Sequence, residues 1–215
     1  MIIETQKTVK VKELEHLISK SGGGTWRALY DVLYYTRLLK YVHKSQYKTI
    51  KSHYFKITAD WKLKDLCEKG YLYSPSQDVY CASNKVLPIL EAVGYNMTLP
   101  SEPRGKGDIN EISNTSAFIQ LIKEPYFYTL LYPNFGYLIP DALLVEKNER
   151  KYRLTFIEVE RPKPDWEYWI ENKKNNYFKL SKDYQVYDYW LIVCEKLGFP
   201  KPQIVDFKFN YKIIK

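Results

Sequence analysis

In the first half of the chain, apolar and aromatic residues recur every three or four positions, the spacing of one face of an α-helix. This pattern predicts a helix from residue 26, a second helical stretch through Leu38, Leu39 and Val42, and a third helix within residues 57–70. Thr25 is expected to cap the first helix, whose apolar face carries Trp26, Leu29, Tyr30, Leu33 and Tyr34. Asp60 is expected to cap the third helix, and Gly70 to follow its end.

Two short runs of alternating residues follow, 71–73 and 79–81, joined by the turn-rich residues 74–78. They predict a β-hairpin, and residues 84–94 predict a further helix that ends at a glycine. Three helices followed by a hairpin is the order of a winged helix, whose third helix enters the major groove while the hairpin lies on the DNA backbone. A protein-docking module with the same element order is the alternative. On the DNA-binding interpretation, the candidate contact residues are Lys56, Lys62, Lys64 and Lys69.

The second half has a different pattern, in which strand-like runs are flanked by helical ones. The expected elements are a helix at 115–123, strands at 127–133, 136–147 and 152–160, a helix at 165–182, and β-rich runs at 188–195 and 204–214. This order predicts an α/β sandwich around a mixed sheet.

Residues 97–109 are rich in Pro, Gly and charged residues and have no apolar periodicity, which is typical of a linker. We therefore expect domains at 1–96 and 110–215. Residues 1–96 contain 15 Lys and Arg against 9 Asp and Glu, a net charge of +6, whereas residues 97–215 contain 18 against 16, a net charge of +2. The basic excess predicts that the first domain binds duplex DNA, and a merely lysine-rich surface is the alternative.

The remaining composition narrows the class of protein. The longest apolar runs are too short or too interrupted to span a bilayer, so no membrane partner is expected. No segment at the N-terminus has the pattern of a signal peptide. Cys67, Cys81 and Cys194 have no metal-ligand spacing and are expected to be free thiols, which favours a cytoplasmic protein.

The run 152–160 places two acids where a buried sheet would normally carry Val or Ile. Because side chains alternate along a strand, Phe156, Glu158 and Glu160 are expected to share one face. Two like charges on a half-buried face destabilise the fold unless they are neutralised, and a divalent cation could neutralise them. The alternative is that both acids point to solvent on an edge strand.

The order of four features resembles the PD-(D/E)xK nuclease fold: Asp141 at a strand end, a hairpin, Glu158-Val159-Glu160 and a following helix. The resemblance implies that Asp141, Glu158 and Glu160 bind Mg²⁺ or Mn²⁺ and act in phosphodiester hydrolysis. Glu160 stands where the family has its lysine. Lys173 falls on the apolar stripe of the helix 165–182, so it is expected to reach Glu158 or Glu160 and to replace that lysine in the catalytic set. Extension of its ammonium to the helix edge is the alternative.

Five features together resemble the replication-relaxation family of plasmid, phage and mobile-element proteins: the winged-helix pattern, the linker, PDALLVE, FIEVER and a helix with Lys-x-x-x-Tyr at 173–177. The resemblance implies an α+β or α/β chain that acts in replication or mobilisation, with replication or mobilisation proteins, or a second copy of the chain, as partners. Three hypotheses remain open: a metal-dependent DNA endonuclease, a non-catalytic DNA-binding regulator whose second domain dimerises or docks a partner, and a protein-interaction module.

Overall fold

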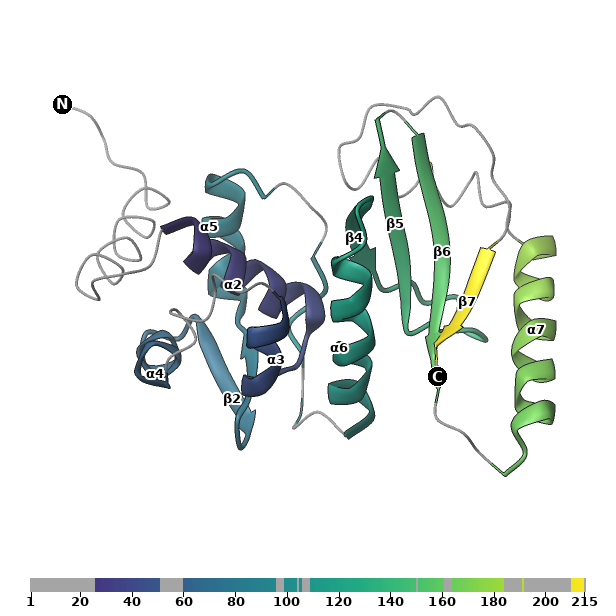
Figure 1. Cartoon of the computed structure of the whole chain (residues 1–215), viewed down its shortest axis with the longest axis horizontal. Coiled ribbons are helices and arrows are strands. Elements are labelled where there is room, and N and C mark those ends of the chain that lie inside the picture. Colours follow the sequence, from purple (N-terminus) through teal and green to yellow (C-terminus); the bar gives the residue numbers. More distant parts are fainter. Residues whose placement is uncertain are drawn as a thin grey trace. The chain divides into compact units, whose positions relative to one another are not determined.

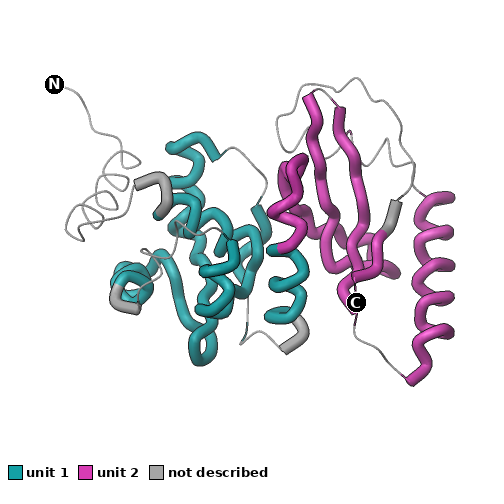
Figure 2. The backbone as a smooth tube through the Cα atoms, viewed as in Figure 1, with its two compact units in different colours: residues 1–119 teal, residues 120–215 magenta. Residues whose placement is uncertain are grey.

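The computed structural model describes residues 26–50, 60–95, 99–103, 105, 109–149, 151–160, 164–183, 191 and 210–214. The chain forms two compact units, residues 1–119 and residues 120–215 (Figure 2). The fold combines helices with two sheets, one antiparallel and one mixed, as the sequence predicted at this level.

Within its described residues, the first unit contains four helices, a 3₁₀ turn and three strands before the chain enters α6 (Figure 1). In chain order they are α2 (Trp26–Leu39), β1 (Val42–His43), α3 (Lys44–Ile50), α4 (Asp60–Glu68), β2 (Leu72–Ser76), β3 (Val79–Ala82), η2 (Asn84–Val86), α5 (Leu87–Ala92) and α6 (Ile109–Ile122). The strands form an antiparallel sheet in the order β1-β3-β2.

Helix α2 ends where the backbone enters the left-handed region at Lys40, with φ 66°. A left-handed residue interrupts the helical hydrogen-bond pattern, so the chain leaves the helix there. The prediction of a second helical stretch through Leu38, Leu39 and Val42 was therefore wrong. Leu38 and Leu39 belong to α2, and Val42 lies in β1, opposite Tyr80 of β3.

The expected hairpin is confirmed as β2 and β3. Its turn contains Asp78 with φ 57°, a conformation that aspartate tolerates better than most residues. Gly70 follows α4 with φ +71°, as expected of a residue after a helix end. The helix predicted at 84–94 consists of η2 and the short α5, and Gly94 follows its end with φ 92°.

A buried arginine connects α2 to the end of the hairpin. Arg37 is 1% exposed, and its guanidinium donates to the Ala82 carbonyl at 2.7 Å and to Asn84 Oδ1 at 2.7 Å. Desolvation lowers the pKa of Arg37, and nearby Glu102 opposes that shift. These two bonds fix the start of η2 against the helix.

The described part of residues 97–109, the expected linker, contacts the rest of the first unit. Glu102 Oε2 accepts from the Asn84 backbone N–H at 2.8 Å, and the Tyr73 hydroxyl donates to the Pro103 carbonyl at 2.5 Å. The start of α6 also belongs to this unit, because Thr115 Oγ1 donates to the Tyr41 carbonyl at 2.6 Å. The division between the units thus falls within α6, beyond residues 97–109.

The part of the second unit that the structure describes contains a four-stranded sheet and a long helix. Its elements are β4 (Phe127–Leu131), β5 (Ala142–Asn148), β6 (Lys151–Val159), α7 (Trp166–Asp183) and β7 (Asn210–Ile214). The strand order is β4-β5-β6-β7, with antiparallel pairing as far as β6 and parallel pairing between β6 and β7. The sheet is therefore mixed, as predicted.

The strand expected at 136–147 begins only at Ala142. Residues 132–141 are irregular, because Pro133 and Pro140 cannot donate to a strand ladder and Gly136 has φ +81°. The β-rich run predicted at 188–195 lies outside the described residues except Leu191, and of 204–214 only β7 is described.

Alternation along β5 and β6 builds the core beneath α7. Leu143 and Val145 of β5 stand opposite Phe156 and Leu154 of β6, and all four are buried on one face of the sheet. Tyr177 of α7 packs on this face, with its ring centroid 5.6 Å from that of Phe156. Helix α7 therefore covers the face on which Glu158 also lies.

Candidate functional site

The candidate site lies where β5 begins and β6 ends. Ala142 is paired with Ile157, so Asp141 and Glu158 come next on the two neighbouring strands. Side chains opposite one another in an antiparallel pair point to the same face, which brings the two carboxylates together. The sequence prediction that Phe156 and Glu158 share a face follows from the same alternation, and both side chains are buried beneath α7.

Glu158 is the buried member of the group, with 1% of its surface exposed. The Lys173 ammonium lies 2.8 Å from its Oε2, and the Tyr177 hydroxyl donates to its Oε1 at 2.8 Å. Burial raises the pKa of Glu158 above its ordinary value, the bonds from Lys173 and Tyr177 lower it, and the Asp141 charge raises it. Glu158 is therefore a desolvated carboxylate held by two donors from one helix.

Asp141 and Glu160 complete the group from better-exposed positions. Asp141 Oδ2 accepts from the Val159 backbone N–H at 2.7 Å, which ties the start of β5 to the end of β6. The Glu160 backbone N–H donates to the Ile214 carbonyl at 2.8 Å, so β7 holds the end of β6 from its other side. Hydrogen bonds thus hold the Asp141 carboxylate and the Glu160 backbone at one end of the two central strands.

One carboxylate oxygen from each of Asp141, Glu158 and Glu160 lies within 4.8 Å of the others. Hard divalent cations prefer oxygen ligands of this kind, and Mg²⁺ usually takes only one or two carboxylates and keeps several waters. Half-buried Asp141 and Glu160 offer oxygen ligands of this kind, whereas Glu158 is buried and already held by its two donors.

Lys173 reaches Glu158, as the position of Lys173 on the apolar stripe of the helix predicted. Its side chain is 20% exposed, and its Nζ also lies 5.4 Å from the centroid of the Trp169 ring. The sequence analysis assigned no hydrogen-bond partner to Tyr177, whose hydroxyl donates to Glu158. A buried tyrosine needs a partner for its hydroxyl, and that requirement was the available signal.

The lysines predicted to contact DNA lie on or beside α4, with one exception. Lys62 is half-buried and Lys64 is exposed, with its Nζ 3.9 Å from Glu68 Oε1. Lys69 is exposed immediately after the helix, and Lys56 lies outside the described residues. Burial lowers the pKa of Lys62. Of the three candidates that the structure describes, Lys64 and Lys69 have exposed side chains.

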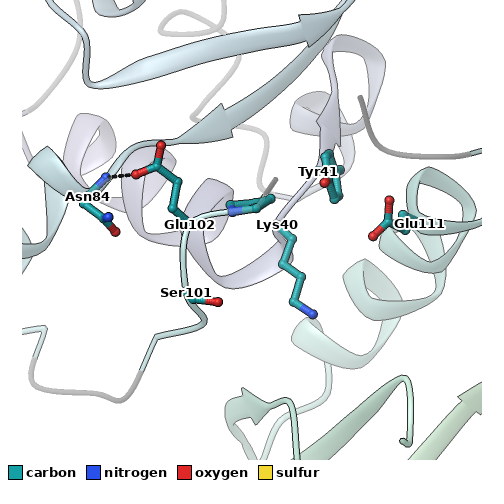
Figure 3. A pocket seen from close by; sticks show the side chains of 7 residues that line it. Lys40, Tyr41, Asn84, Ser101, Glu102 and Glu111 are labelled. Atoms are coloured by element: carbon teal, nitrogen blue, oxygen red, sulfur yellow. Dashed lines mark hydrogen bonds between the residues drawn. The ribbon is translucent and has the colours of Figure 1, made fainter. Parts of the chain in front are cut away.

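A separate pocket of about 600 Å³ lies in the first unit (Figure 3). Lys40, Glu102 and Glu111 line it from three different segments, together with Tyr41, Asn84, Ser101 and Pro103. Figure 3 shows Glu102 bonded to the Asn84 backbone. The pocket contains none of the residues predicted from the sequence, and its mixed charges favour no particular ligand.

Among the described residues, no helix combines the length and apolar composition needed to cross a bilayer. Comparisons of the chain with protein-family models, with curated proteins and with solved structures found no match.

Proposed function

We propose that this protein is a Mg²⁺- or Mn²⁺-dependent DNA endonuclease whose first unit binds duplex DNA. The observation that carries the proposal is the convergence of Asp141, Glu158 and Glu160 within 4.8 Å, with the Lys173 ammonium 2.8 Å from Glu158. The carboxylates lie at the ends of two adjacent strands, and the ammonium comes from the helix that covers them. This arrangement supports the resemblance to the PD-(D/E)xK fold.

Each residue has a distinct proposed role. Asp141, Glu158 and Glu160 would hold the cation, which when bound polarises a phosphoryl oxygen and lowers the pKa of bound water. Lys173 favours the charged form of Glu158, because it lowers the pKa that burial raises, and their hydrogen bond fixes the orientation of the carboxylate. Its ammonium would also position the attacking water or stabilise the negative charge that develops on the phosphate.

The first unit supports the DNA-binding part of the proposal. Helices α2, α3 and α4 followed by the β2–β3 hairpin have the element order of a winged helix, and β1 adds a third strand to the hairpin. The net charge of +6 in residues 1–96 suits a polyanionic partner. In this arrangement α4 is the helix presented to the major groove, with Lys64 and Lys69 directed to phosphates.

The resemblance to the replication-relaxation family extends the proposal to a process. On that basis the protein acts in the cytoplasm in the replication or mobilisation of a plasmid, phage or other mobile element, with a second copy of the chain or other replication proteins as partners. Among the three hypotheses, the carboxylate group favours the endonuclease because a simple scaffold does not need clustered acids on a half-buried face.

Cation binding is the direct test of the proposal. A saturating cation at about 100 times its dissociation constant stabilises a protein by roughly 2.7 kcal/mol. We expect Mn²⁺ to raise the melting temperature of the full chain, Asp141→Asn to lose this shift, and Glu146→Gln to keep it, since Glu146 of β5 lies outside the carboxylate group. Supercoiled plasmid should be cleaved in Mg²⁺ by the wild type and left intact by Asp141→Asn. No shift in Mn²⁺ would refute the endonuclease proposal.

One observation favours a second candidate, the non-catalytic DNA-binding regulator. Lys173 and Tyr177 already satisfy both oxygens of Glu158 without a cation. In a regulator this network would hold α7 on the sheet and the second unit would dock a partner. DNA binding without Mn²⁺ binding or cleavage would favour this candidate.

A further inference from the structure

Both carboxylate oxygens of Glu158 already have a donor from α7. The Lys173 ammonium lies 2.8 Å from Oε2, and the Tyr177 hydroxyl donates to Oε1 at 2.8 Å. Glu158 is 1% exposed, so its carboxylate has little contact with solvent. A divalent cation that binds Glu158 must therefore share an oxygen with one of these donors or replace that donor.

The two donors differ in how easily they can leave. Tyr177 is 1% exposed and packs on Phe156 in the core, with the ring centroids 5.6 Å apart. Lys173 is 20% exposed, and its ammonium stands at the end of a long, flexible side chain. Its Nζ also lies 5.4 Å from the centroid of the Trp169 ring, which attracts a cation that leaves Oε2. Tyr177 is therefore fixed, whereas Lys173 can release its oxygen.

The ammonium and a bound cation repel each other if they share Oε2. An ammonium 2.8 Å from this oxygen and a Mg²⁺ ion about 2.1 Å from it would be at most about 5 Å apart. Even with the dielectric constant of water, a single and a double positive charge at this distance repel enough to weaken binding about tenfold or more. The Tyr177 hydroxyl is neutral and causes no such repulsion, and a carboxylate oxygen can accept more than one bond.

We propose that the Lys173 ammonium occupies the place of the divalent cation at Glu158 Oε2 and is displaced from it when the cation binds. This inference rests on the proposed function, because it takes the carboxylate group as the cation site. Lys173 then has two successive partners, which are Glu158 before the cation binds and the phosphate afterwards. The positive charge that acts on the phosphate is thus released only in a site that holds its cation.

Calorimetric titration of Mn²⁺ into the full chain at pH 7.5 tests the inference. Lys173→Met removes the competing ammonium, so it should bind Mn²⁺ about tenfold or more tightly than the wild type. Lys173→Gln keeps a neutral donor and should change the affinity in the same direction. Lys174→Met is the matched control and should bind within about twofold of the wild type, because Lys174 pairs with Glu171 on the exposed side of α7. Affinities of both Lys173 variants equal to or below that of the wild type would overturn the inference.

A measurement on the wild type does not depend on the folding of a variant. Acetylation by an N-hydroxysuccinimide ester, measured by peptide mass spectrometry, reports how accessible the amine of each lysine is. Replacing EDTA with saturating Mn²⁺ should raise the acetylation of Lys173 several-fold and leave that of Lys174 unchanged. Unchanged acetylation of Lys173 in a wild type saturated with Mn²⁺ would also overturn the inference.

The inference and the endonuclease proposal fail on different results. If the wild type binds Mn²⁺ but the Lys173 variants bind it no more tightly, the inference fails and the cation site stands. If only the Lys173 variants bind Mn²⁺, the ammonium holds the site permanently, so the endonuclease proposal fails while the place assigned to Lys173 stands. Absence of Mn²⁺ binding in the wild type and in both variants would refute both.

Discussion

Replacing Lys173 by methionine removes one charge from the candidate site while keeping most of the apolar side chain. In the wild type, the ammonium lies 2.8 Å from Glu158, and the two side chains are 20% and 1% exposed. In Lys173→Met the Tyr177 hydroxyl still donates to Glu158, but the opposite charge has gone. A buried charge that loses its partner is strongly destabilising, so the folded state should lose stability.

The cost has an upper limit, because Glu158 can take up a proton instead of remaining charged. Protonation costs about 1.4 kcal/mol for each pH unit above the ordinary glutamate pKa of 4.5. The limit is therefore about 3.4 kcal/mol at pH 7 and about 0.7 kcal/mol at pH 5. When the pKa of a carboxyl group is higher in the folded state than in the unfolded state, the folded protein loses stability as the pH rises through that pKa. The destabilisation caused by Lys173→Met should therefore grow from pH 5 to pH 7.

Urea unfolding of the full chain in EDTA, followed by circular dichroism, measures this difference. Lys174→Met is the matched control, since Lys174 pairs with Glu171 at 3.8 Å on the exposed side of the same helix. An exposed pair of this kind contributes about 0.5 kcal/mol or less. The reasoning would be refuted if Lys173→Met destabilised the protein equally at both pH values. It would also be refuted if the effect of Lys173→Met at pH 7 were no larger than that of Lys174→Met.

Three further predictions concern separate groups. Tyr177→Phe keeps the ring that packs on Phe156 and removes the hydrogen bond to the buried Glu158 carboxylate. Urea unfolding should show that the free energy of unfolding falls by about 1.5–3 kcal/mol. A fall of less than about 0.5 kcal/mol would contradict this prediction. Lys64→Ala should lower the slope of log affinity against log salt for duplex DNA by about one unit. Its melting temperature should not change, because the ion pair of Lys64 with Glu68 is exposed. An unchanged slope would count against α4 as the recognition helix. Burial raises the pKa of the Cys81 thiol to about 12. Iodoacetamide at pH 8 should therefore leave Cys81 unmodified in the native protein and alkylate it in urea, which peptide mass spectrometry can measure. Rapid alkylation of the native protein would show that Cys81 is not buried.

The long, strongly periodic elements were predictable from the sequence, and they contain the candidate site. The helix expected at 165–182 is α7 at Trp166–Asp183, and the strand expected at 152–160 is β6 at Lys151–Val159. Because both periodicities were correct, the sequence placed Lys173 within reach of Glu158 or Glu160, and in the structure it pairs with Glu158. The prediction succeeded because burying a lysine and a glutamate on facing elements is costly unless they pair.

Elements held by long-range pairing were not predictable. Strand β1 has two residues and exists because Val42 and His43 pair with β3, about 37 positions away, so it has no periodicity of its own. Helix α3 was also missed, since a helix of seven residues depends on its packing more than on propensity. The bond from Asp141 to the Val159 N–H depends on strand register, which the sequence leaves open until the hairpin turn is known.

The parallel pairing of β6 with β7 has a consequence for the order of folding. Asn148 and Lys151 of the β5–β6 hairpin are three positions apart, whereas Thr155 and its partner Asn210 in β7 are 55 apart. Closing the longer loop costs roughly 2–3 kcal/mol more in chain entropy, so the β5–β6 hairpin should form first and β7 should join last. The hairpin brings Asp141 and Glu158 together before β7 can fix the backbone of Glu160. The two carboxylates must therefore meet early in folding as like charges, and the docking of α7, which brings in Lys173, is the step that relieves their repulsion.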